Sequence, residues 1–127
     1  MKLNYDLIRE LLKTAECKEN NSSLSHSELN TFCNENNYSQ ETLIYHLERL
    51  KEVDYIDATI RYSSNQPFFY TINYITWDGH QFLDTIRSNK VWNTTKKVAD
   101  DLKIKSISAF SQIAFQVAST LITKYLS

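Results

Sequence analysis

The chain has 127 residues, of which 42% are hydrophobic and 23% are charged, and its formal net charge is −1. This length suits one domain with an extension and is too short for two independent cores, while a single glycine and a single proline exclude a low-complexity or linker-like tract. The two cysteines, Cys17 and Cys33, form neither a dense disulfide framework nor a CxxC zinc or redox motif.

The charge is distributed unevenly along the chain. Residues 1–76 contain 7 Lys and Arg against 11 Asp and Glu, a net charge of −4, whereas residues 77–127 contain 7 against 4, a net charge of +3. A protein that grips duplex DNA through its first half would carry the opposite sign there. No basic segment followed by an apolar run opens the chain, so we expect no signal peptide and a cytoplasmic location.

Three helices are predicted in the first half. Apolar side chains at helical spacing lie on one side of the first helix along its whole length: Leu3, Leu7, Ile8, Leu11, Leu12 and Ala15. After a polar turn at residues 20–23, Ser25 and Glu28 form a capping box for a second helix that runs to about Asn34 and directs Leu29, Phe32 and Cys33 inward. Ser39 caps a third helix over residues 39–53. Its expected buried side is formed by Leu43, Leu47, Leu50 and Val53.

A β-hairpin is predicted next. Residues 55–62 alternate apolar and polar side chains, residues 68–75 are rich in aromatic and β-branched types, and the polar segment 63–67 supplies the turn. Three helices followed by a hairpin is the order of a winged-helix domain, in which the hairpin is the wing. We therefore predict an α+β, mainly α fold, with a winged-helix domain over residues 1–89 and a C-terminal helical extension over residues 90–127.

The segment around the chain's only glycine, Gly79, allows two interpretations. Thr76 can cap a helix that starts at Trp77, and a glycine in its first turn costs about 1 kcal/mol relative to alanine, which indicates that something packs too closely for a Cβ. Alternatively, Asp78 and His80 form a proton-transfer or metal pair. Residues two apart on a helix point in different directions, and no nearby Cys, Glu or second His completes a site. We expect the structural role.

Motifs of enzyme chemistry are not found. The sequence contains no Gly-rich phosphate loop, GxSxG or HExxH motif, and His26, His46 and His80 share no ligand spacing. We therefore expect a non-enzymatic protein without catalytic residues, cofactor or metal, in which His46, at the edge of the third helix's core stripe, is a packed residue.

Three segments carry a resemblance to a known family: MKLNYDLIRELL at the start, YHLERLKEVDYI in the middle, and ITWDGHQFLDTIRSNKVWNTTK at residues 75–96. They resemble the uncharacterised domain of unknown function twenty-five thirteen over roughly residues 1–100. The resemblance implies a small winged-helix protein of the kind frequent in bacteriophages and prophages, acting in a bacterial cytoplasm. It implies no catalytic residues, so function must be argued from surfaces.

The outer face of the third helix is the first candidate surface. Projection at 100° per residue places five side chains opposite or beside the buried leucines: Glu41, Tyr45, Glu48, Arg49 and Glu52. Three glutamates have the wrong sign for a phosphate-lined groove, whereas a tyrosine amid charge is common at protein-binding hot spots. The alternative is a solvated helix face. We expect these residues to bind a protein partner, favoured to be basic.

Two later segments are the other candidates. Basic residues interleaved with an aromatic could contact nucleic acid or be the solvated side of a helix: Arg87, Lys90, Trp92, Lys96 and Lys97. From Ser106 to Thr123 no charge occurs, and a polar stripe argues against a membrane span. We expect this apolar face to form a homodimer, with docking on its own domain as the alternative: Phe110, Ala114, Val117, Leu121 and Tyr125. A helix on a membrane surface is a third alternative, which the absence of lysine from the polar face disfavours.

The functional hypothesis is binding to a macromolecule, with a protein partner slightly favoured. Interference with a host process such as a nuclease-based defence would fit the phage setting. The alternative hypothesis is a DNA-binding transcriptional regulator that uses the later basic residues.

Overall fold

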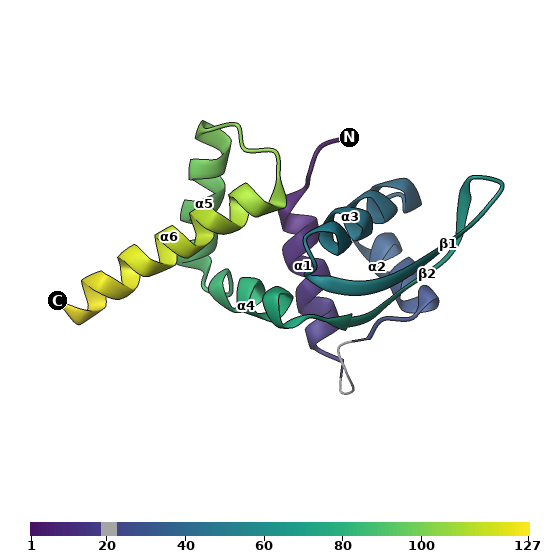
Figure 1. Cartoon of the computed structure of the whole chain (residues 1–127), viewed down its shortest axis with the longest axis horizontal. Coiled ribbons are helices and arrows are strands. Elements are labelled where there is room, and N and C mark those ends of the chain that lie inside the picture. The colour runs from purple at the N-terminus through teal and green to yellow at the C-terminus, as the bar shows by residue number, and fades with distance from the viewer. Residues whose placement is uncertain (19–22) are drawn as a thin grey trace.

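A computed structural model describes residues 1–18 and 23–127, so most of the polar turn expected at residues 20–23 lies outside the described residues. The described part has an α+β, mainly helical architecture, as predicted (Figure 1). Its elements, in chain order, are α1 (Tyr5–Glu16), α2 (His26–Asn36), α3 (Gln40–Glu52), β1 (Ile56–Ser63), β2 (Gln66–Ile75), α4 (Trp77–Thr85), α5 (Asn89–Asp101) and α6 (Ile107–Leu126).

Polar side chains set where the helices begin. The predicted capping box is confirmed, because the Ser25 hydroxyl accepts from the Glu28 amide and the Glu28 carboxylate accepts from the Ser25 amide. The Ser39 hydroxyl caps α3 and the Thr76 hydroxyl caps α4, the latter by accepting from the Gly79 amide at 3.1 Å. Each such cap contributes about 1 kcal/mol to stability.

The hairpin is tighter than the sequence indicated. Ser63 pairs with Gln66, so only Ser64 and Asn65 connect the strands, and both have positive φ angles, 52° and 65°. Positive φ at both central residues is the requirement of a type I′ turn, whose twist matches the flanking strands. The predicted turn at residues 63–67 was therefore too long, because strand pairing continues through Pro67.

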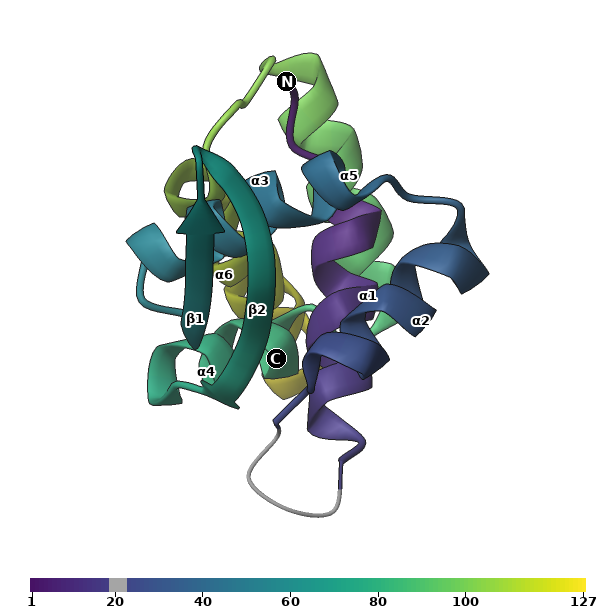
Figure 2. The same cartoon turned by 90° about the vertical axis from the view of Figure 1, so that its right-hand side faces the viewer.

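A single residue before α2 extends the sheet on its other edge. Leu24 exchanges two backbone hydrogen bonds with Ile72 of β2, at 2.9 and 3.0 Å. Figure 2 shows the hairpin beside α1 and α2 and in front of α3. The short bridge thus joins the segment between α1 and α2 to the strands that follow α3.

One hydrophobic core joins the first helices to the last. The Phe110 ring of α6 stacks on Tyr5 of α1 at 3.9 Å and meets Trp92 of α5 edge-on at 5.5 Å and Phe82 of α4 at 6.3 Å. All four residues contribute to one cluster of packed side chains. The core therefore crosses the expected boundary between residues 89 and 90 without a break.

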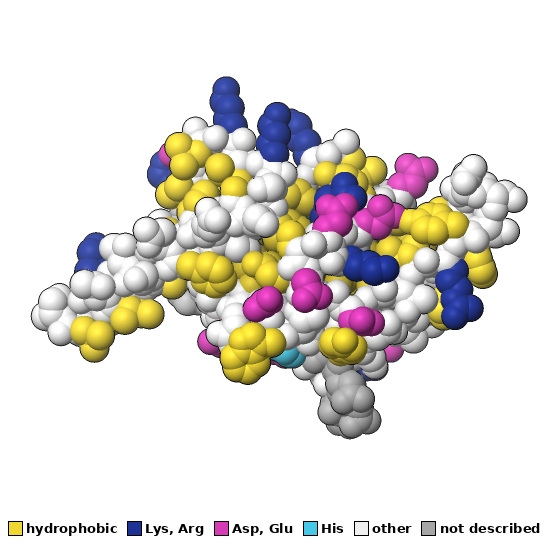
Figure 3. All heavy atoms as spheres, viewed as in Figure 1, with side chains coloured by type: hydrophobic (Ala, Val, Ile, Leu, Met, Phe, Trp, Pro, Cys, Tyr) yellow, Lys and Arg dark blue, Asp and Glu magenta, His cyan; other side chains and the backbone are white. Residues whose placement is uncertain are grey.

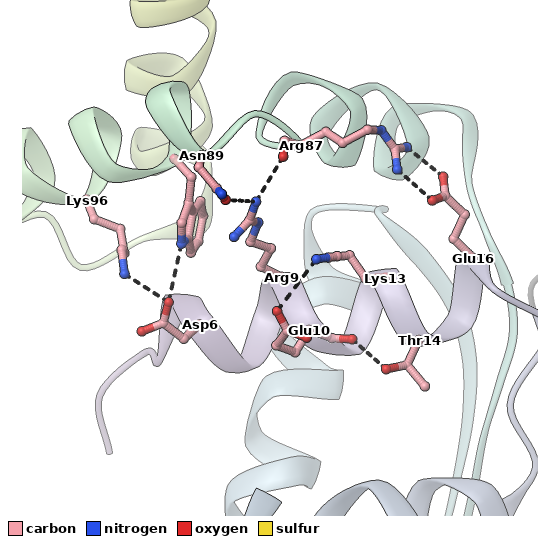
Figure 4. Close-up of polar contacts among 10 residues, drawn as sticks. Asp6, Arg9, Glu10, Lys13, Thr14, Glu16, Arg87, Asn89 and Lys96 are labelled. Carbon is pink, nitrogen blue, oxygen red and sulfur yellow. Dashed lines mark hydrogen bonds and ion pairs between the residues drawn. The ribbon is translucent and has the colours of Figure 1, made fainter.

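The buried Arg9 connects α1 to the junction of α4 and α5 (Figure 4). Its Nη2 donates to the Arg87 carbonyl at 2.9 Å and to the Asn89 amide oxygen at 3.1 Å, and its guanidinium carbon lies 5.1 Å from the Trp92 ring. A buried cation must regain the interactions that it loses with water. Arg9 regains them from a carbonyl, an amide and an aromatic face of the second half of the chain.

Gly79 is required by a close approach between α4 and the start of β1. A Cβ at this position would lie 2.0 Å from the Tyr55 carbonyl oxygen and 2.8 Å from Cγ2 of Ile75. The structural interpretation of the glycine is confirmed. Among the described residues, no group of three or more His, Cys, Asp and Glu could hold a metal ion.

Substituting Gly79 with alanine should destabilise the protein although alanine favours helices. The methyl group meets backbone, which cannot rotate away, so we expect a loss of about 3 kcal/mol or more in the free energy of unfolding. Urea denaturation monitored by circular dichroism measures it, with Gln81→Ala at an exposed position of the same helix as the control. Equal stabilities of the two variants would contradict the close approach.

His46 is a packed core residue, as expected. It is fully buried, its Nδ1 lies 2.7 Å from the Thr42 carbonyl, and its Nε2 lies 2.8 Å from the backbone nitrogen of Asn4. A carbonyl can only accept and an amide can only donate, so the ring is neutral with its proton on Nδ1. Burial lowers the pKa of His46 below 6.5, against a smaller opposing effect of the bond to Thr42.

This lowered pKa predicts a loss of stability in acid. As the pH falls below 6.5, the unfolded chain takes up a proton at His46 that the folded protein resists, so the free energy of unfolding decreases. A His46→Gln variant should show a flatter dependence between about pH 7 and about pH 5. Urea titrations of both proteins across this range measure the difference, and parallel curves would assign the acid sensitivity to other groups.

Candidate protein-binding surface

The five residues predicted on the outer face of α3, here called the α3 strip, lie together on that face: Glu41, Tyr45, Glu48, Arg49 and Glu52. They are exposed or half-buried, and Leu43, Leu47 and Leu50 behind them are fully buried. Ile44, which is not part of the predicted leucine stripe, is also buried. Helix α3 therefore has a wider buried side than the leucine stripe predicted, and the outward side is correspondingly narrower.

Charge and aromatic contacts organise the α3 strip. The Arg49 guanidinium carbon lies 5.1 Å from the centre of the Tyr45 ring, and the same side chain forms an ion pair with Glu52 and lies 3.7 Å from Glu48. This arrangement places one face of the Tyr45 ring under the Arg49 cation, which in turn lies next to the Glu48 and Glu52 carboxylates. Pairs of this kind at the surface contribute little to stability, so the strip is free to change its contacts when a partner binds.

The strip continues onto the hairpin of β1 and β2, for which we keep the name wing. The Tyr62 hydroxyl of β1 donates to the Glu48 carboxylate, and this bond raises the pKa of Tyr62. The Tyr62 side chain is 50% exposed. With Lys51, Glu52 and Ile60, these two residues line a shallow hollow of about 410 Å³. The α3 strip and the wing thus form one surface with two accessible tyrosines.

A groove on the other side of Tyr45 was not visible in the sequence. It has a volume of about 760 Å³ and lies between residues 1–5, Tyr45 and the connection from α5 to α6. The Tyr5 hydroxyl donates to the Ile104 carbonyl at 2.8 Å and fastens that connection to α1. Three lysines line the groove and form no ion pair with any described residue: Lys2, Lys103 and Lys105. These residues come from distant elements, so spacing along the chain carried no signal of the groove.

Trp92 and Lys96, predicted as nucleic-acid contacts, are engaged with α1 (Figure 4). Trp92 is only 3% exposed, and its indole N–H donates to the Asp6 carboxylate at 3.3 Å. Lys96 binds the same carboxylate at 3.0 Å. The Trp92 ring is therefore a core residue and cannot stack on a base in this conformation.

The remaining predicted basic residues do not form one free surface. Arg87 makes a two-pronged ion pair with Glu16 of α1, at 2.9 and 2.8 Å. Lys97 pairs with Asp101 at 3.6 Å along α5, and Lys90 is exposed. Two of these three cations are thus neutralised by carboxylates of the same chain.

Helix α6 is divided along its length. Of the five predicted oligomerisation residues, Phe110 and Ala114 are buried in the core of their own chain, Val117 and Leu121 are half-buried, and Tyr125 is 82% exposed. The first half docks on its own domain and the second half projects away from it (Figure 1). No helix among residues 1–18 and 23–127 combines the length and the apolar character needed to cross a bilayer.

Comparisons with known proteins place the chain in a family without assigning a role. An uncharacterised protein of Haemophilus influenzae is 36% identical over 128 residues, and the alignment covers all of both chains. No solved structure matches. The sequence profile of the DUF2513 family of hypothetical proteins matches residues 2–106. This match covers most of the chain, including the α3 strip, the wing and α4, and the chain therefore belongs to the DUF2513 family.

Proposed function

We propose that this protein is a non-enzymatic winged-helix protein that acts by binding another protein through the α3 strip and the wing. The observation that carries the proposal is the pair of accessible tyrosines, Tyr45 and Tyr62, held among carboxylates on one surface. Tyrosine supplies large contact area at low entropic cost, and it is frequent at binding hot spots.

The winged-helix assignment is supported by the order of the elements. Three helices precede the hairpin, and the Leu24 bridge adds a one-residue strand between the first two of them. In this arrangement α3 is the element that would enter the major groove of DNA. Its outer face carries Glu41, Glu48 and Glu52, and carboxylates would meet the phosphates with the wrong sign. A basic protein surface is electrostatically the better fit.

A role in interference with a host process, such as a nuclease-based defence, is part of this proposal. Proteins that handle nucleic acids expose basic surfaces, which the acidic α3 strip would complement. The family resemblance implies a phage or prophage protein, and a protein of that kind would meet host defence proteins in the bacterial cell.

Tyr45→Ala combined with Glu48→Lys should abolish partner binding and leave thermal stability nearly unchanged. Both side chains point away from the buried leucines of α3, so only the outer surface changes. Affinity capture from the host followed by mass spectrometry identifies the partner, and calorimetry then compares affinities. Glu35→Lys, at an exposed position on α2, is the charge-matched control. Binding by the double variant with wild-type affinity would remove the α3 strip from the proposal.

A DNA-binding regulator is the second candidate, because Lys2, Lys103 and Lys105 line the groove beside Tyr45 without forming ion pairs with described residues. The acidic α3 strip next to the groove predicts weak binding to random duplex DNA even at about 50 mM salt, where a binder driven by phosphate contacts would be strong. Fluorescence anisotropy titration measures this. Sub-micromolar affinity that Lys103→Glu abolishes would reverse the ranking of the two candidates.

The outer half of α6 is proposed to form a homodimer. Its exposed apolar side chains are Ile122, Tyr125 and Leu126, and Phe115 near the middle of the helix is also exposed. Burying each large side chain contributes about 1.5–3 kcal/mol, enough in sum to hold a dimer at micromolar concentration. An interface of this kind would repeat the same helix on both copies, as twofold symmetry requires.

Ile122→Glu combined with Tyr125→Glu should convert the dimer into a monomer, so that the measured mass falls from twice the chain mass to the chain mass of 14.9 kDa. Point substitutions are preferable to truncation, because removing α6 would also take Phe110 and Ala114 out of the core. Light scattering measures the mass, and Gln116→Glu, at an exposed position of the same helix, should leave the dimer intact. A wild-type protein that runs as a monomer would refute the dimer.

A further inference from the structure

Trp77 is exposed in a way that the fold does not explain. Its side chain is 76% accessible at the first position of α4. Gly79 must face Tyr55, and residues two apart on a helix point in nearly opposite directions, so Trp77 is directed into solvent. A helix can begin with a small polar residue there, yet the chain places its largest side chain in water. Tryptophan is among the residue types enriched at protein-binding hot spots.

A second aromatic residue and three aspartates lie on the chain segments that adjoin Trp77: the Thr76 hydroxyl, next to Trp77, donates to the Asp54 carbonyl. Tyr74, at the end of β2, is 48% exposed, and it lies opposite Asp57 in the strand register. The charges of Asp57 and, more weakly, Asp54 raise the pKa of Tyr74, which indicates a negative local potential. Asp78 follows Trp77 along α4 and is exposed. We call Asp54, Asp57, Tyr74, Trp77 and Asp78 the Trp77 patch.

Figure 3 shows acidic and hydrophobic side chains next to one another over the end of β2 and the start of α4. This side of the molecule also carries acidic side chains near the wing and α3. Acidic side chains thus gather locally around the end of β2 and the start of α4, while Lys and Arg side chains lie elsewhere on the same face (Figure 3).

Among the described residues, no cation–π contact and no ion pair engages the Trp77 patch. Trp92 lies 5.1 Å from Arg9 and 5.3 Å from Lys96, and Tyr45 lies 5.1 Å from Arg49, whereas neither Trp77 nor Tyr74 has such a neighbour. None of the ion pairs between described residues involves the three aspartates of the patch.

We propose that the Trp77 patch binds an arginine- or lysine-bearing segment of a partner protein. An indole face is the best aromatic acceptor for a cation, and carboxylates at its border add long-range attraction. The same carboxylates repel nucleic acid and anionic lipid surfaces, both of which present negative charge. The inference rests on the proposed function in that the ligand is a protein. It uses a separate surface, because the Trp77 patch and the α3 strip share no residue.

Nuclear magnetic resonance of the full chain gives a direct test, because the two tryptophans provide a reporter and an internal reference. The probe is an arginine-rich synthetic peptide, matched by a peptide in which citrulline replaces each arginine and removes the charge at constant size. The indole N–H signal of Trp77 should shift with the arginine peptide alone. The signal of Trp92, which is buried and bonded to Asp6, should stay fixed. Trp77→Phe assigns the two signals.

Trp77→Ala should weaken binding of the arginine peptide by about tenfold or more, as expected for a tryptophan at the centre of a site. The unchanged Trp92 signal shows that this variant is folded. Asp57→Asn combined with Asp78→Asn should also lower the affinity for the arginine peptide. Its loss of affinity relative to the wild-type protein should be larger at low salt than at high salt, because the carboxylates act through charge. Tyr45→Ala with Glu48→Lys, on the α3 strip, should leave binding intact, so the two surfaces are tested independently.

Four outcomes would overturn the proposal. Absence of any shift of the Trp77 signal with the arginine peptide would show that the patch does not bind it, and equal shifts with the citrulline peptide would show that charge is not recognised. Undiminished binding by Trp77→Ala would move the site elsewhere. A Trp77 signal that moves when the free protein is diluted would assign the patch to contact with a second copy of the chain.

Discussion

The approach of α4 to the Tyr55 carbonyl is the contact on which the second half of the structure depends. With hydrogen in place of a methyl group, Gly79 lets the first turn of α4 lie directly on the backbone before β1. The same helical face then directs Phe82, Leu83 and Ile86 into the core. The orientation of α4 about its own axis also determines which of its residues face solvent. The buried Gly79 and the exposed Trp77 therefore result from the same packing constraint.

The position of α4 in turn sets the polar connection that holds α5. Arg9 donates to the Arg87 carbonyl and to Asn89 at the junction of the two helices, and no carboxylate of residues 1–18 and 23–127 forms an ion pair with it. Its Nε has no hydrogen-bond partner among the described residues. Removing water from an arginine without providing a carboxylate is costly in free energy. Arg9 therefore specifies the position of α5 rather than adding much net stability, because only one position of α5 gives the guanidinium its hydrogen bonds and its contact with the Trp92 ring.

The features that the sequence predicted are local, and those it did not predict depend on distant residues. The caps at Ser25, Ser39 and Thr76 follow from hydrogen bonds that span three residues, and the glycine constraint could be inferred from its helical cost. The groove beside Tyr45 requires Tyr5 and Ile104 to meet across the fold. Likewise, the sequence could not show that Lys96 is engaged, because its partner carboxylate, Asp6, lies on α1, far away in the chain. A helical projection finds the outward side of α3 but cannot show which of its flanks other elements cover, as at Ile44.

The contact between the first and last elements has a consequence for how the chain reaches its folded state. Tyr5 bonds a carbonyl 99 residues further along, and its ring packs on Phe110. Closing a loop of that length costs conformational entropy before any contact compensates for it. During synthesis, α1 would leave the ribosome long before the residues that cover it. The N-terminal helices and the wing must therefore persist for a time with part of α1 uncovered, and chaperones or early association with other copies could act on the chain in that interval.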